Sequence, residues 1–218
     1  MVGKVIRWNW DDFVLVAAVQ GGLFIVLELV IGIILMTVRP DTTVAIGGIL
    51  LPIGGGIFAL IASVNTPTVL FDLIVKSSVT RKRALLGTVS MMLLLTAETM
   101  LLGWLLGQAD VLIARAWVDH LPWLEAVEFE GVLPLWIWAL AAVGITLFGL
   151  GGGAALQRFG LKAFWVLWGA WMALMLLSSQ IDWDALFGMA ATVPLLAAAA
   201  VGLGGWGCWS LLHGSVRA

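Results

Sequence analysis

Six stretches of the chain are apolar over roughly 20 residues each, which is the length needed to cross the hydrocarbon of a bilayer. In lipid every backbone N–H and C=O must be paired within the protein, so a crossing segment is either an α-helix or a strand of a closed barrel. The six runs are continuous and lack the two-residue alternation of barrel strands. The sequence therefore predicts an all-α integral membrane protein.

Composition supports this prediction, because 62% of the 218 residues are hydrophobic and only 11% are charged. A soluble domain of this size needs far more charged surface. We expect a single transmembrane domain over 1–218 that crosses the membrane six times. The predicted spans are 13–38, 44–64, 84–106, 133–156, 163–178 and 186–212.

The positions of lysine and arginine predict the orientation, since positively charged loops stay on the cytoplasmic side. With the N-terminus inside, only Arg39 and Arg115 of the 11 Lys and Arg residues fall outside. Both termini are therefore expected to be cytoplasmic. Residues 1–12 are expected to lie at the interface, and 107–131 to form an extracellular loop with short helices at 109–117 and 120–127.

The predicted cytoplasmic loop, 65–83, is longer than a connection requires. Thr66 or Thr68 can cap a helix there, with Pro67 tolerated near its start. This helix would place Leu70, Phe71, Ile74 and Val75 on one side and Asp72 and Lys76 on the other.

Thr80, Arg81, Lys82 and Arg83 follow this helix and lead into the third span. One interpretation is a basic anchor at anionic lipid headgroups. The other is a docking helix for a soluble partner, because an anchor alone does not need an amphipathic segment.

The order of these segments resembles the small six-helix permease subunits of ABC-2-type exporters, including exporters of peptides and antimicrobials. Such permeases carry a phenylalanine-containing helix followed by G-x-S/T-R-K/R; here the match runs from Phe71 to Ser78-Val79-Thr80-Arg81-Lys82, with Ser78 where glycine is common. The architecture covers nearly the whole chain, whereas the motif covers a short part of it.

The resemblance implies a type V exporter-like fold in the plasma (inner) membrane of a bacterium, with residues 4–12 as an interfacial elbow helix. It also implies an ATPase-coupling element formed by Phe71, Asp72, Lys76, Thr80, Arg81, Lys82 and Arg83. The expected partners are ABC ATPase subunits, which bind the ATP and Mg²⁺, and a second copy or a homologous permease. The expected substrate is a peptide, lipid or drug, and the alternative function is a membrane scaffold or sensor that docks a cytoplasmic partner.

Two glutamates lie in the middle of predicted spans: Glu28 in the first and Glu98 in the third. A carboxylate in hydrocarbon is costly, so such residues normally face the protein interior or a wet cavity. Three interpretations remain open: a polar lining of a substrate path, a hydrogen bond between helices, and proton coupling.

Glycine pairs at four-residue spacing, Gly103/Gly107 and Gly149/Gly153, predict close helix packing. Gly54, Gly55 and Gly56 could mark a bend in span two. The three glycines of a G-x-G-x-x-G pattern lie within an apolar span, where a nucleotide site is not expected: Gly202, Gly204 and Gly207.

The chain contains no phosphate-binding loop, so no cofactor is expected in it. His120, His213 and Cys208 are isolated from one another and predict no metal site. Since no catalytic set lies at one depth, the sequence argues against an enzyme, and nucleic acid is not an expected partner.

Overall fold

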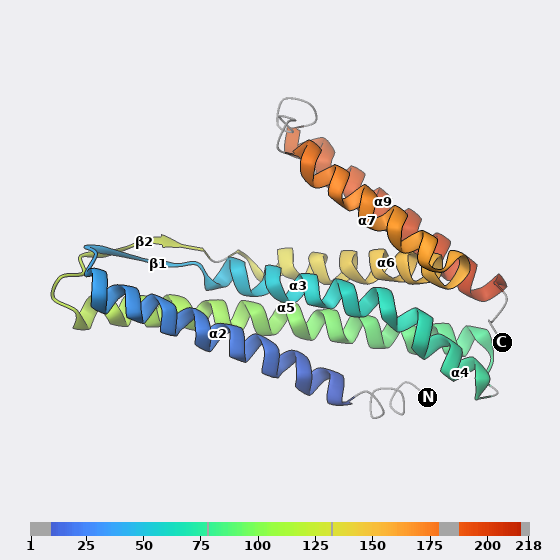
Figure 1. Ribbon diagram of the computed structural model, residues 1–218, viewed down its shortest axis with the longest axis horizontal. Helices are drawn as coiled ribbons and strands as arrows, with labels where there is room; N and C mark the ends of the chain where they lie inside the picture. Colours follow the sequence, from blue (N-terminus) through green and yellow to red (C-terminus); the bar gives the residue numbers. More distant parts are fainter. Residues whose placement is uncertain (1–9, 78, 132, 179–187, 215–218) are drawn as a thin grey trace. The chain divides into compact units, whose positions relative to one another are not determined.

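The computed structural model describes residues 10–77, 79–131, 133–178 and 188–214, which are mostly helical with two short strands (Figure 1). In chain order the elements are α2 Trp10–Val38, β1 Thr42–Ala45, α3 Gly47–Thr66, the π-helix η1 Pro67–Phe71, α4 Asp72–Lys76, α5 Arg81–His120, β2 Ala126–Glu130, α6 Leu135–Phe159, α7 Leu161–Ser178 and α9 Gly188–His213.

Four helical stretches in the described part of the chain are long and apolar enough to cross a membrane: Trp10–Val38, Gly47–Lys76, Arg81–His120 and Leu135–Phe159. They are compatible with a membrane location and with the all-α class. Helices α7 and α9 coincide with the fifth and sixth predicted spans. Most of the predicted interfacial segment, 1–9, lies outside the described residues.

Helix α5 is longer than a membrane crossing requires. Its 40 residues extend over about 60 Å at 1.5 Å per residue, twice the hydrocarbon thickness of about 30 Å. The prediction of a loop beginning at residue 107 was therefore wrong, and the predicted short helix 109–117 is part of α5. The helix ends at His120 because Pro122 follows, and the residue before a proline avoids the helical region.

The second predicted helix of the outer loop, 120–127, was also wrong. Ala126–Glu130 forms β2, which pairs in parallel with β1 (Figure 1). A register shift between Thr43 and Val44 interrupts the pairing. The predicted second span began at 44, but Val44 and Ala45 belong to this sheet and α3 begins at Gly47. Hydropathy cannot separate an apolar strand residue from the start of an apolar helix.

The expected cytoplasmic loop is mostly helical. Helix α3 continues through the π-helix η1 into α4, which ends at Lys76, and α5 begins at Arg81. The predicted N-cap does not form: the Thr66 hydroxyl donates to the Ala62 carbonyl at 2.8 Å, and Thr68 donates to Asn65 at 2.6 Å. Pro67 has no N–H to donate, and the π-turn begins at this residue.

The described residues form two compact units. We call 10–59 with 93–143 the N-terminal unit and 60–92 with 144–214 the C-terminal unit. Helices α3, α5 and α6 contribute residues to both.

Helix packing in the N-terminal unit depends on glycine, as the sequence predicted for Gly103 and Gly107. A Cβ on Gly103 would lie 2.9 Å from the Pro52 Cα, and a Cβ on Gly107 would overlap Gly48. Helices α3 and α5 therefore approach each other more closely than alanine allows. Gly55 lies within unbroken α3, against Gln20 and Thr99, and the helix continues beyond it to Thr66.

Candidate functional site

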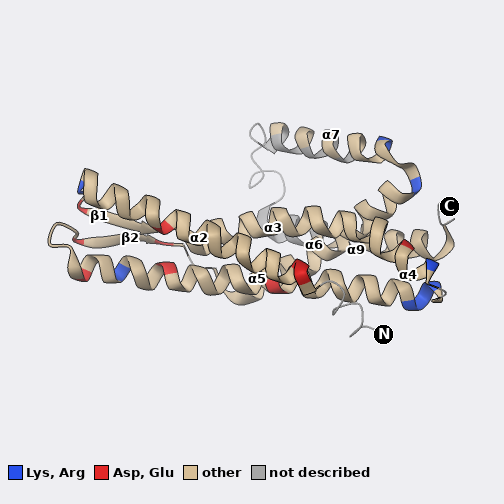
Figure 2. Ribbon diagram, turned by 60° about the horizontal axis from the view of Figure 1, so that its bottom comes forward, with Lys and Arg blue, Asp and Glu red and all other residues tan. Residues whose placement is uncertain are grey.

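The basic residues around the connection between α4 and α5 form the first candidate site, in the C-terminal unit. Figure 2 shows Lys and Arg positions, coloured blue on the ribbon, clustered beside α4. Lys76, Thr80, Lys82 and Arg83 are exposed, and we call these four residues the basic stretch. Asp72 is the single acidic residue among the described residues of this unit.

Phe71, which the sequence grouped with these cations, is not on the surface. Its side chain is 1% exposed, and Leu70 and Ile74 are also buried. Leu70, Phe71 and Ile74 thus form one buried face of η1 and α4. Phe71 can hold the helical segment in place but offers almost no area to a partner.

Asp72 and Arg81 make contacts inside the unit. The Gln157 amide of α6 donates a hydrogen bond to the Asp72 carboxylate. One Arg81 Nη donates to the Leu212 carbonyl at 3.2 Å and also to the Gly214 carbonyl, at the end of α9. Of the seven residues expected in the coupling element, Phe71 is buried, Asp72 and Arg81 contact other helices of this unit, and the basic stretch contains the other four.

Helix α6 packs tightly against two elements through its glycines. A Cβ on Gly153 would lie 2.6 Å from the Val64 carbonyl oxygen, and a Cβ on Gly151 would lie 2.8 Å from that of Leu203. From α9, a Cβ on Gly207 would meet the Leu150 carbonyl oxygen at 2.8 Å. The predicted close approach at Gly153 is confirmed, and backbones at such distances allow little independent sliding.

A second candidate site is the carboxyl pair Glu28 and Asp110 in the N-terminal unit. Their carboxyl groups lie next to each other, on α2 and α5. Asp110 is 1% exposed and accepts a hydrogen bond from the Gly47 N–H at 2.7 Å. Gly47 is the first residue of α3, so Asp110 satisfies one of the free N–H groups at this helix start.

Glu98 is not brought into this pair. It lies half-buried on α5, and its Oε2 is buried without a hydrogen-bond partner in the described part of the chain. The residue after Glu98, Thr99, accepts a hydrogen bond of 3.0 Å at its carbonyl from the Gln20 amide of α2. Helix α2 has three buried residues, Val16, Gln20 and Leu35, and this hydrogen bond ties the buried Gln20 to α5.

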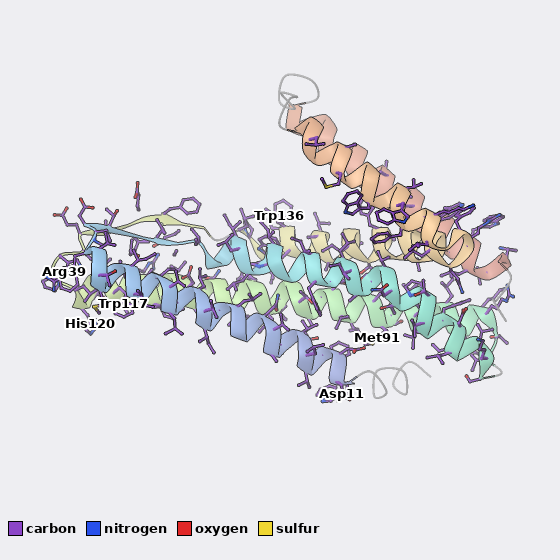
Figure 3. The ribbon with its side chains drawn as sticks, viewed as in Figure 1. Asp11, Arg39, Met91, Trp117, His120 and Trp136 are labelled. Atoms are coloured by element: carbon purple, nitrogen blue, oxygen red, sulfur yellow. The ribbon has the colours of Figure 1, made fainter. Side chains whose placement is uncertain are left out.

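Cations and aromatic rings meet where α2 ends. Arg39 ends the helix with a positive φ of 51°, and its guanidinium lies 5.0 Å from the centre of the Trp123 ring. Figure 3 shows Arg39, Trp117 and His120 close together at this end of the N-terminal unit. Here Arg115 donates two hydrogen bonds of 2.8 Å to the carboxylate of Glu130 in β2.

The Arg115–Glu130 contact predicts a pH effect. The guanidinium holds the pKa of Glu130 below its ordinary value of 4.5. Since the pKa is lower in the folded state, the contact stabilises the protein above pH 4.5 and is lost as the pH falls below it. We expect Glu130→Gln to lower the melting temperature at neutral pH, and the difference from the native protein to shrink as the pH falls below 4.5. Glu125→Gln is the control; a Glu130→Gln difference that persists at low pH would contradict the prediction.

Sequence reasoning missed two contributors to these sites. Asp110 fell in the predicted loop 107–131, whereas it lies inside α5. Gln157 was not singled out, since a glutamine at the end of an apolar helix gives no specific signal.

Comparison with protein-family models, with curated proteins and with solved structures finds no match. In the described part of the chain, no three His, Cys, Asp or Glu residues come together as a metal site.

Proposed function

We propose that this chain is the membrane-spanning permease subunit of an ATP-driven ABC exporter. The resemblance of the Phe71–Lys82 segment to ABC-2 permeases and the four long apolar helices support this proposal. In it, the chain has the type V exporter-like fold with six spans, and both termini lie in the cytoplasm of a bacterium.

The observation that carries the proposal is the contrast between the basic stretch and the residues before it. Phe71 and Ile74 are buried, whereas Lys76, Lys82 and Arg83 are exposed. A firmly packed helix followed at once by free cations suits a docking surface for an acidic face of a soluble protein. We assign that partner as the ATPase subunit, which would hold the ATP and Mg²⁺.

In this proposal the exporter contains two permeases, and ATP-driven closure of the ATPases acts on the basic stretch. Glu28 and Glu98 then contribute polar groups to a path through otherwise apolar helices, as intramembrane carboxyls commonly do. Such a path suits an amphipathic peptide, lipid or drug.

Charge reversal of the basic stretch tests the proposal. We expect Lys82→Glu/Arg83→Glu to weaken binding of the partner ATPase about tenfold or more, because a loss of about 1.4 kcal/mol at an interface is a factor of ten. Binding is measured by co-purification and by ATP hydrolysis of the purified complex. Lys162→Glu, also exposed and in the same unit, is the matched control.

Equal binding by the native chain and the double variant would contradict the docking assignment. If no ATPase co-purifies with the native chain, the permease proposal fails. Binding of a different soluble protein, lost on charge reversal, would instead favour the alternative of a scaffold or sensor.

A further inference from the structure

Arg81 differs from the cations on either side of it. Lys76, Lys82 and Arg83 are exposed, whereas Arg81 is half-buried and bonded to the Leu212 and Gly214 carbonyls. Those carbonyls belong to the last turn of α9 and the residue after it. Helix ends leave such carbonyls without backbone partners, and a cation there is also favoured by the helix dipole.

The other contacts of the C-terminal unit complete a closed series around Arg81. Asp72 of α4 is bonded to Gln157 of α6. Helix α6 in turn contacts α9 where Gly207 meets Leu150. Arg81 is the first residue of α5, a few residues after α4 ends, and its hydrogen bond to Leu212 links this helix start to the end of α9.

We infer that Arg81 is a positioning residue, which joins the basic stretch to the end of α9 so that the two move together. Arg81 does not touch the docked partner. It transmits a displacement of the basic stretch, caused by the partner, to α9. The transmission rests on the proposed function, whereas the anchoring of α9 by Arg81 stands without it.

Cys208 provides a native reporter for this inference. It is the single cysteine of the chain, it is half-buried, and it lies on α9 one turn before Leu212. Its rate of alkylation by N-ethylmaleimide therefore reports on how well the end of α9 is held. The measurement needs no introduced label.

The first experiment compares alkylation rates in the full chain. We expect Arg81→Gln to raise the rate about fivefold, which corresponds to a local weakening of about 1 kcal/mol. Arg81→Lys should give an intermediate rate, because lysine keeps the charge but its shorter side chain cannot reach as far as the Arg Nη that donates to both carbonyls. The matched controls, Lys82→Gln and Arg83→Gln, should leave the rate unchanged. Equal rates in Arg81→Gln and the native chain would overturn the inference.

The second experiment adds the purified ATPase and ATP. In the native chain the alkylation rate should change when ATP is added, and in Arg81→Gln this change should disappear although the ATPase still binds. If Arg81 only stabilised the end of α9, Arg81→Gln would not abolish the response of the alkylation rate to ATP while leaving ATPase binding intact. Persistence of the response in Arg81→Gln would overturn the transmission. Failure of the ATPase to bind the native chain would overturn the transmission together with the proposed function, and the first experiment would still decide the anchoring.

Discussion

Replacing Phe71 with alanine is expected to lower the melting temperature by about 10 °C. Phe71 is among the largest fully buried side chains of the described residues, at 1% exposure. Its removal leaves a cavity, and phenylalanine-to-alanine changes in cores cost about 3 kcal/mol or more. For a chain of this length each kcal/mol lowers the melting temperature by roughly 3 °C.

Leu73→Ala is the matched control, two residues away on the same helical stretch. Leu73 is 60% exposed, so its truncation leaves no cavity, and the melting temperature should change by less than about 2 °C. A loss at Leu73→Ala equal to that at Phe71→Ala would show that the segment is not packed as described.

This stability effect changes how a Phe71 variant is interpreted in a transport assay. Loss of ATPase coupling on Phe71→Ala could follow from loss of the packed helix rather than from a lost contact with the partner. Lys82 and Arg83 are exposed, so their replacement leaves no buried cavity. Charge reversal at these two positions is therefore the cleaner test of docking.

The helices could be predicted from the sequence where apolar residues form long runs. The cores of α2, α5 and α6 fall within predicted spans, because burial in lipid needs only a continuous apolar surface. The ends were less predictable. Asp110 is polar and yet lies inside α5, and its partners, Glu28 and Gly47, come from distant parts of the chain.

The candidate docking site shows the same limit. The amphipathic pattern around Phe71 correctly placed Leu70 and Ile74 on its face, since that pattern depends only on helical periodicity. It could not reveal that Arg81 faces α9, more than 130 residues later, while its neighbour Lys82 is exposed. Three consecutive cations are equivalent in a sequence, and only tertiary contacts separate them.

The glycine spacing predicts a second large effect, which concerns the contact between α3 and α5. We expect Gly107→Ala to destabilise the protein by about 2–3 kcal/mol, because the added Cβ would overlap Gly48 and lie 2.8 Å from its backbone N. Backbone atoms cannot rotate away as a side chain can, so the two helices must separate. That separation would also strain the Gly47–Asp110 hydrogen bond of 2.7 Å nearby.

Gly144→Ala makes the same chemical change on α6 where no atom lies within 4 Å of the new methyl group. Alanine is a better helix former than glycine by about 1 kcal/mol, so this variant should be neutral or slightly more stable. Thermal unfolding of both variants in the same detergent separates packing from helix propensity. If both gain stability, α3 and α5 are not in backbone contact at Gly107. If only Gly107→Ala loses stability, the small residue at that position is needed for the close approach that brings Gly47 to Asp110.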